Sequence, residues 1–409
     1  MVNSHRFGSG TPPPSDISFA VQDIATGTAT GSTSYTSATI TGLTPAATLL
    51  MGSIHAIAND PGETPTASMT WGIIQDTLDY NLTNKSADNV ASTDNVRDSS
   101  SVSFPYYLFD AGGSGVEIAT GANISGGLSL NYSTNDATDR RAMSVSFAGS
   151  NVSAKAGIIP LGTGTTAITV SGVGFQPDAI ILLGNNDDMD TGTAIFQCTF
   201  GVATADGTQR SVSWRELHAA TSGAPSQNIS TTAGAGQNSG GGTASEIVIG
   251  GFGADGFTAT PSASQGSDDL LYLALKFTGG ACKIVDLTTP TSTGSSTISG
   301  AGFTPRFALV VITNLEAVDS VAGTTSDLQS GLGISFVGDE QWATSWRIDS
   351  GADPTDTASQ CSNAAIMGPS ATDCDAILAS FTAWTSDGMT VNYSAVQGTA
   401  KKGFVLFIE

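Results

Sequence analysis

The segment GVGFQPDAIILL at 172–183 recurs as GAGFTPRFALV at 300–310, and a shorter relative, TGLTPAATLLMG, stands at 41–52. Each version joins glycine to proline and then to an apolar run. Glycine permits a turn conformation that other residues avoid, and proline is expected at the first residue of a strand, where its missing N–H costs nothing. An unbroken apolar run is typical of a strand that is covered on both faces. The segment therefore predicts a structural role and not a ligand site.

Further landmarks recur in the same order and at nearly the same offset. The structural landmarks of the repeat are three prolines and three glycines: Pro45, Pro177, Pro305, Gly127, Gly256 and Gly388. Successive prolines are 132 and 128 residues apart, and successive glycines are 129 and 132 residues apart. Self-similarity at a constant period indicates a repeated structural unit.

The repeat divides the chain into an arm and three units, which we call copies 1, 2 and 3. The predicted bounds are 1–16 for an extended proline-rich arm, 17–149 for copy 1, 150–279 for copy 2 and 280–409 for copy 3. Copy 1 is the most divergent, since Lys85 stands where copies 2 and 3 have Trp214 and Trp346.

Within each copy the apolar residues alternate with small or polar ones, as in MSVSF, LYLALKF and MTVNY. This period of two is typical of a half-buried strand, and clusters of Gly, Asn, Asp, Pro and Ser interrupt it as turns would. The sequence predicts an all-β chain of three tandem antiparallel β-sandwiches of jelly-roll type, each around its own apolar centre.

The charge balance excludes one class of partner. The chain has 14 Lys and Arg against 36 Asp and Glu, for a net charge of −22, so it repels phosphates and no nucleic-acid partner is expected. The longest apolar runs are too short for a membrane span, and the N-terminus has no apolar secretory core, so neither a membrane partner nor an export signal is expected.

No catalytic set is recognisable. The three histidines lie at unrelated positions, the chain has no G-x-S-x-G motif, and the four cysteines form no C-x-x-C pair. We therefore expect no enzyme activity and no cofactor, and we expect the cysteines to be small buried or loop thiols.

Two groups of residues remain as candidates for binding. In GNNDDMDTG at 184–192, Asp187, Asp188 and Asp190 offer oxygen ligands to Ca²⁺, although a solvated loop explains them more simply. The second group consists of three tryptophans that have the shape to stack on a sugar but are more often core residues: Trp214, Trp342 and Trp346. Trp384 has the same shape and the same two interpretations.

The G-x-G-F-x-P start, the D-G-F/M-T strand and the closing LYLALKF-like strand resemble uncharacterised repeat-containing virion-associated proteins of marine tailed bacteriophages. The resemblance covers copies 2 and 3 well and copy 1 weakly. Together with the architecture, it implies a non-enzymatic virion structural protein on the capsid exterior (decoration, turret or spike) or on the tail (fibre or baseplate). Such a protein is assembled in the host cytoplasm, and its expected partners are other virion proteins and copies of itself.

The alternative is a glycan-binding module for receptor recognition or adhesion, with or without the help of calcium. Its expected partner is a host-surface glycan.

Overall fold

The computed structural model describes most of the chain. The described residues are 17–56, 62–76, 78–87, 95–100, 106–109, 115–185, 192–193, 196–216, 225–238, 243–263, 268–322, 329–338, 340–349, 356–370 and 372–409. They form antiparallel strands and one short 3₁₀ helix, η1 (Ala38–Ile40), which confirms the predicted all-β class.

The strands of copy 1 form a large and a small sheet, apart from β4 (Thr64–Pro65), which pairs with copy 3. They are β1 (Ser18–Ala25), β2 (Gly31–Thr36), β3 (Ala47–Ala56), β4 (Thr64–Pro65), β5 (Ala67–Gln75), β6 (Leu78–Ser86), β7 (Asn95–Ser100), β8 (Tyr106–Phe109), β9 (Gly115–Ile124), β10 (Gly127–Thr134) and β11 (Arg140–Ala148). The large sheet has the order β1-β11-β3-β5-β6-β7, and the small sheet has the order β2-β10-β9-β8. Pairing of the first strand with the last, and of the second with the last but one, follows the jelly-roll pattern, whereas β5-β6-β7 and β8-β9-β10 are meanders.

Copy 2 repeats this plan strand for strand. Its strands are β12 (Val152–Pro160), β13 (Ile168–Ser171), β14 (Ala179–Gly184), β15 (Gly192–Thr193), β16 (Phe196–Thr204), β17 (Gln209–Glu216), β18 (Ser226–Ser230), β19 (Ala235–Asn238), β20 (Thr243–Gly253), β21 (Gly256–Pro261) and β22 (Asp269–Phe277). The sheets are β12-β22-β14-β16-β17-β18 and β13-β21-β20-β19.

Copy 3 repeats it again. Its strands are β23 (Cys282–Thr288), β24 (Gly294–Ser299), β25 (Phe307–Thr313), β26 (Ser320–Ala322), β27 (Gln329–Val337), β28 (Gln341–Asp349), β29 (Thr357–Ser362), β30 (Ile366–Gly368), β31 (Ile377–Thr385), β32 (Gly388–Ala395) and β33 (Lys402–Ile408). The sheets are β23-β33-β25-β27-β28-β29 and β24-β32-β31-β30.

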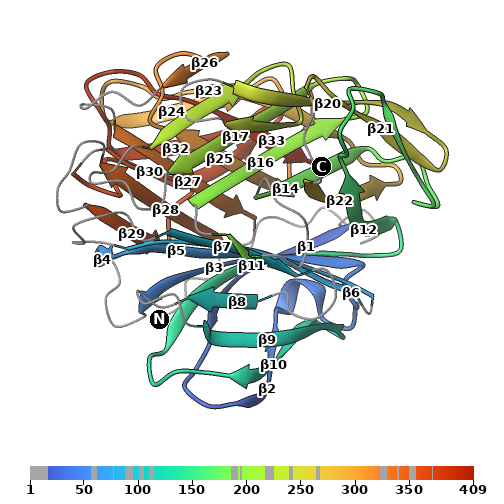
Figure 1. Cartoon of the computed structure of the whole chain (residues 1–409), viewed down its shortest axis with the longest axis horizontal. Helices are drawn as coiled ribbons and strands as arrows, with labels where there is room; N and C mark the ends of the chain where they lie inside the picture. The colour runs from blue at the N-terminus through green and yellow to red at the C-terminus, as the bar shows by residue number, and fades with distance from the viewer. Residues whose placement is uncertain are drawn as a thin grey trace.

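The large and small sheets of each copy pack face to face. In copy 1, for example, Leu50 and Ile74 of the large sheet share a buried cluster with Leu128 and Leu130 of the small sheet. Corresponding clusters lie in copies 2 and 3. Figure 1 shows the three sandwiches around a common centre, with copy 1 (blue to teal) below and copies 2 (green to yellow) and 3 (orange to red) above.

A separate core lies at that centre and belongs to all three copies. Along β14, Ile180 and Leu182 point into the sandwich of copy 2, whereas Ile181 and Leu183 join a cluster that also contains Leu309 of copy 3. The apolar run that opened the sequence analysis is therefore covered on both faces by two different cores. The expectation that each copy packs only around its own centre is wrong in this respect, because the large sheets bury their second faces against one another.

Each large sheet also ends on a short strand that comes from another copy. Strand β15 of copy 2 pairs with β7 of copy 1, β26 of copy 3 pairs with β18 of copy 2, and β4 of copy 1 pairs with β29 of copy 3. In every case the donated strand is the fourth of its copy, so the exchange is cyclic. The three copies thus form a closed ring with threefold pseudosymmetry.

The proline landmarks lie just before a strand and not at its first residue. Pro45, Pro177 and Pro305 are buried, and each precedes its apolar strand by two residues. The residue after each proline already donates its N–H to the neighbouring strand, as Asp178 does to the Leu275 carbonyl at 2.8 Å. Each proline therefore stands at the last position before the strand where the lack of a backbone N–H removes no hydrogen bond from the sheet.

The glycine landmarks stand where two strands approach very closely. A Cβ at Gly127, Gly256 or Gly388 would lie 2.1, 1.9 or 2.0 Å from a carbonyl oxygen of the adjacent edge strand, that of Tyr35, Val170 or Ile298 respectively. Such a contact is impossible for any other residue without movement of the backbone.

The part of the chain that the structure describes contains no helix with the length and apolar character that a membrane crossing would need.

Candidate functional site

Two of the three candidate tryptophans lie inside the central core. Trp214 and Trp346 are 0% and 1% exposed, and their ring centroids are 5.5 Å apart. A third indole, Trp71 of copy 1, lies 6.2 Å from Trp346. Since neither ring face reaches the surface, Trp214 and Trp346 stabilise the junction of the three copies and do not offer a stacking surface to a sugar.

Trp342 is partly exposed and lies on β28, where copy 3 meets copy 1. The guanidinium carbon of Arg141, from copy 1, lies 4.9 Å from the centroid of the Trp342 ring. Arg141 also forms an ion pair with Asp23, with Nε and Oδ1 3.1 Å apart. The indole Nε1 donates to the Glu340 carboxylate at 3.3 Å. One face of Trp342 is therefore occupied by a cation–π contact within the protein.

The equivalent position in copy 2 has a different chemistry. Four residues before Trp214 is Arg210, just as Trp342 is four residues before Trp346. Arg210 forms an ion pair with Asp286 of copy 3, with Nε and Oδ1 2.6 Å apart. Copy 1 has Tyr80 at this place, since Asp79 corresponds to Gln209 and Gln341. The scaffold thus accepts either an ion pair or an aromatic ring here, and Trp342 differs from the buried Tyr80 in being partly exposed.

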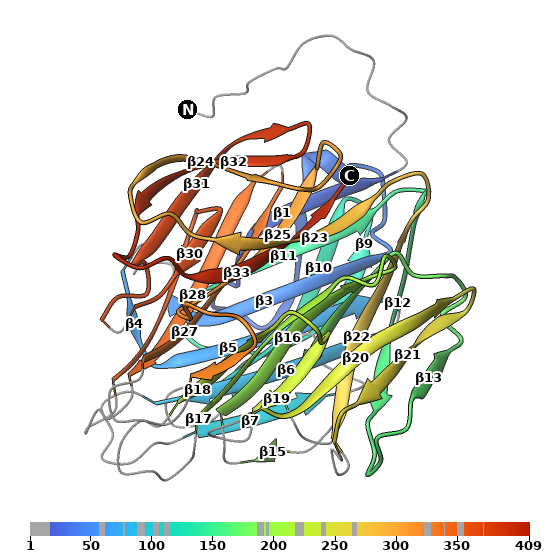
Figure 2. The ribbon, with the colours of Figure 1, turned by 90° about the horizontal axis from the view of Figure 1, so that it is seen from above.

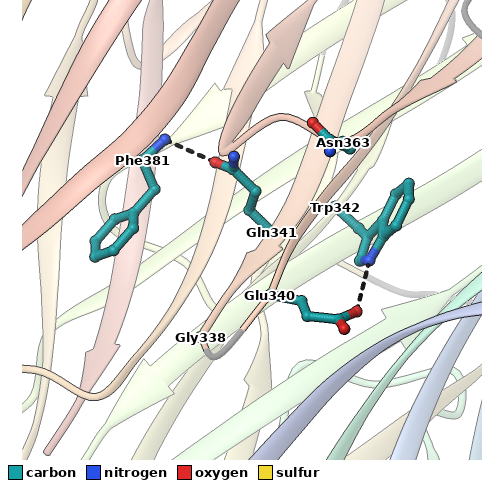
Figure 3. A pocket seen from close by; sticks show the side chains of 6 residues that line it. All are labelled: Gly338, Glu340, Gln341, Trp342, Asn363 and Phe381. Atoms are coloured by element: carbon teal, nitrogen blue, oxygen red, sulfur yellow. Dashed lines mark hydrogen bonds between the residues drawn. The ribbon is translucent and has the colours of Figure 1, made fainter. Parts of the chain in front are cut away.

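An open depression of about 420 Å³ lies beside Trp342. Its lining residues are Gly338, Glu340, Gln341, Trp342, Asn363 and Phe381. Figure 3 shows the Trp342 indole on one side, with Nε1 turned toward Glu340, and the Phe381 ring on the other side. Asn363 is exposed and comes from the loop after β29. The depression therefore combines two partly exposed rings with an exposed amide and a carboxylate.

A second depression is adjacent to the first and shares Gly338 with it. It is lined by Ser18, Phe19, Thr39, Arg306, Gly338 and Trp384. The Trp384 and Phe381 ring centroids are 4.6 Å apart, so the two rings form one aromatic pair between the depressions. We call the combined surface the copy 1–3 groove; its aromatic members are Trp342, Phe381 and Trp384.

Gln341 has a structural task in this groove. Its Oε1 accepts the backbone N–H of Phe381 at 2.7 Å (Figure 3). Gln209 accepts from the Ile249 N–H at 2.9 Å in copy 2, and in copy 1 the Asp79 carboxylate makes the matching contact. The contact joins the large sheet to the small sheet in every copy, so it belongs to the scaffold.

The groove combines aromatic rings with an amide, a carboxylate and a guanidinium, a set of groups that is compatible with contact to a sugar. The C–H face of a pyranose packs on aromatic rings, and its hydroxyls bond to amide and carboxylate groups. Phe381 and Asn363 are the residues of this surface that the sequence analysis did not select, whereas it did name Trp384. A comparison of the three copies, which places Trp342 beside Arg210 and Tyr80, does not by itself point to this surface, because the exposure of Trp342 depends on the tertiary structure.

The predicted calcium ligands Asp187, Asp188 and Asp190 lie outside the described residues, so their role stays a prediction. Within the described ranges, no group of three or more His, Cys, Asp or Glu side chains is arranged to hold a metal ion.

The cysteines are free thiols. Three are buried (Cys198, Cys361 and Cys374) and Cys282 is half-buried. Burial raises the pKa of the Cys198 and Cys374 thiols well above the ordinary value and that of Cys282 to about 12. Thiols in this state are protonated at neutral pH and are poor nucleophiles.

Comparison of the sequence with protein-family models and with curated proteins gives no match.

Proposed function

We propose that the chain is a non-enzymatic structural protein of a tailed-phage virion that acts through protein–protein assembly. It is carried on the capsid exterior (decoration, turret or spike) or on the tail (fibre or baseplate), and its partners are other virion proteins and copies of itself.

The observation that carries the proposal is the cyclic exchange of β4, β15 and β26 around a shared core. Sandwiches of rolled antiparallel sheets are common building blocks of viral shells. Exchange of strands between units locks them together through backbone hydrogen bonds. One chain of this kind supplies a rigid body of threefold pseudosymmetry, which suits a repeated position on a particle.

The charge of −22 supports an exposed position. A strongly acidic surface keeps crowded copies soluble and does not compete for the packaged nucleic acid.

The test is the composition of purified particles. Phage purified on a density gradient is analysed by quantitative mass spectrometry, and an antibody against the chain is located with gold by electron microscopy. We expect a fixed copy number per particle and label at one structural position. Recovery of the chain only in the soluble lysate would contradict the proposal.

A second candidate is glycan binding at the copy 1–3 groove. The favouring observation is that Trp342 is partly exposed and lines an open depression together with Phe381 and Asn363. This function is compatible with a virion location, since receptor recognition takes place on the virion surface.

A glycan array tests this second candidate. The purified chain is compared with the variants Trp342→Ala and Asn363→Ala, and with Asn392→Ala as a control at an exposed position of β32. We expect binding that is lost in the first two variants and kept in the control. Repetition with a chelator tests whether calcium at Asp187, Asp188 and Asp190 contributes. An array without binding, or binding that is equal in all variants, would contradict a sugar site in the groove.

A further inference from the structure

Three strand edges at the outside of the molecule are open. The small sheets begin with β2, β13 and β24, and within the described residues no strand pairs with the outer side of any of them. An open edge presents a row of backbone N–H and C=O groups that can pair with another strand.

Although β13 is short, these three edges lack the charges and prolines that commonly prevent such pairing. Their sequences are GSTSYT, ITVS and GSSTIS, with no charged residue and no proline. Natural edge strands are normally blunted by lysine, by proline or by an inward-pointing charge. In a chain with a net charge of −22, the three edges are neutral strips on which two molecules can approach with the least repulsion.

The edges are also placed symmetrically. In Figure 1, β2 lies at the bottom corner and β24 at the upper left, while β21, the strand paired with β13, lies at the right. Figure 2 shows β13 itself at the outer margin beside β21. The three copies have different sequences at these strands, yet each keeps the edge neutral, as docking by strand addition at all three would require.

We propose that β2, β13 and β24 are docking edges for further copies of this chain, which pair there as antiparallel strands. The chain already uses strand addition internally, since β4, β15 and β26 each extend the sheet of another copy. Antiparallel pairing of two equivalent edges has twofold symmetry. A body with threefold pseudosymmetry and three twofold edges builds a continuous layer or a closed shell.

The strength of one such contact is low. Four to six residues per edge supply only a few backbone hydrogen bonds, each with a modest net contribution. Association through three edges multiplies the effect, because each further contact forms within an assembly that already exists. Added salt screens the repulsion between two chains of charge −22, so the association should strengthen with salt.

The inference extends the proposed assembly role, but it is measured on the purified full chain and can fail while the virion location stands. Sedimentation velocity is recorded over a range of protein concentrations in low and in high sodium chloride. We expect reversible association that increases by about tenfold or more in the association constant between about 0.05 and 0.5 M salt.

A triple lysine variant tests the edges directly: Ser34→Lys, Thr169→Lys and Ser295→Lys. Pairing of equivalent edges brings like charges close to each other, which is destabilising. The matched control carries three lysines on exposed positions of the inner strands of the same sheets: Thr120→Lys, Val248→Lys and Ser380→Lys. Both variants have the same net charge, and equal melting temperatures show that both are folded.

We expect the edge variant to remain monomeric and the control to associate like the wild type. Equal behaviour of the two variants, or a wild type that is monomeric at all salt and protein concentrations, would overturn the inference. So would association that appears only when residues 1–16 are deleted, since the arm would then be the natural occupant of an edge.

Discussion

At the scale of single residues, the glycine of the D-G-F/M-T strand shows how a landmark of the sequence is explained by one contact. Gly256 has a φ of 148°, and a Cβ at this position would meet the Val170 carbonyl oxygen at 1.9 Å. The residue is therefore required by the close approach of β21 to β13 and not by a ligand.

The substitution Gly256→Ala should lower stability strongly. We expect the free energy of unfolding to fall by about 3 kcal/mol. The alanine would have an unfavourable positive φ, and its Cβ would clash with the Val170 carbonyl, which is fixed in β13. Gly207→Ala is the matched control, because Gly207 also has a positive φ, of 87°, but has open space around it. Urea unfolding of both variants measures the difference, and equal losses would show that the close contact does not matter.

Asp79 is a second residue whose environment has a measurable consequence. Burial raises the pKa of its carboxyl from 3.8 to about 6, although the N–H of Gly121 partly offsets this effect. Between these two values the native state binds a proton that the unfolded state has lost. Stability must therefore fall as the pH rises through this window.

The variant Asp79→Asn removes the charge and keeps an oxygen that accepts from Gly121. We expect the wild type to lose about 2 kcal/mol relative to this variant between pH 4 and pH 7. Melting temperatures of the two proteins across this pH range test the prediction. Parallel pH profiles would mean that Asp79 titrates normally.

At the scale of elements, the strands of the large sheets show why alternation of residue types does not predict which strands are buried on both faces. LYLALKF on β22 was expected to be half-buried, yet Leu273 and Leu275 face the central core while Tyr272 and Ala274 face the sandwich of copy 2. The small and aromatic residues at alternate positions of β22, Tyr272 and Ala274, therefore face a second core and not solvent. The pattern alone does not separate these cases, because alanine and tyrosine are common in both settings.

Strand β4 belongs to copy 1 but completes the sheet of copy 3, and one ion pair beside it joins the two copies. Glu63, next to β4, lies 3.3 Å from Arg347 of copy 3, and Asp356 lies 3.0 Å from the same guanidinium. The Arg347 side chain is only 7% exposed, so its charge depends on these carboxylates.

A double-mutant cycle tests this closure of the ring. We expect Glu63→Ala and Asp356→Ala each to cost about 1 kcal/mol, because the other carboxylate still compensates the charge. The double variant should cost clearly more than the sum, by about 1–2 kcal/mol, because both carboxylates next to a nearly buried guanidinium are then lost. Additive losses in urea unfolding would mean that the two acids act independently.

At the scale of the whole molecule, the three copies depend on one another. The central core joins residues of all three large sheets. The ring centroids of Phe277 and Phe307, for example, lie 6.4 and 5.8 Å from that of Phe147. A single copy would leave the second face of its large sheet open to water.

Residues 150–279 expressed alone should therefore not form a stable monomer. Exposure of side chains such as Ile181, Leu183 and Leu273 costs about 1.5–3 kcal/mol each, which a small domain cannot offset. We expect this fragment to unfold or to associate, with trimers as the favoured product, and light scattering during size-exclusion chromatography measures which. A folded monomer with a sharp melting transition would contradict the shared core.

The sequence by itself determined the local and repeated features of this protein. Alternation, turn clusters and the offsets of Pro45, Pro177 and Pro305 were sufficient for an all-β chain, because strand and turn preferences act between residues that are close in the chain. The sequence also offered Trp342 as one of several tryptophans with the shape to stack on a sugar, but not its neighbours Phe381 and Asn363.

Only the tertiary structure decided which apolar face packs against which partner. Trp214 and Trp346 are core residues, and Trp342 is a surface residue, because of contacts between strands more than a hundred residues apart. The exchange of β4, β15 and β26 was equally invisible, since two or three residues carry no pattern of their own. A sequence states how apolar each face is, whereas the choice of partner for that face depends on the packing of the whole chain.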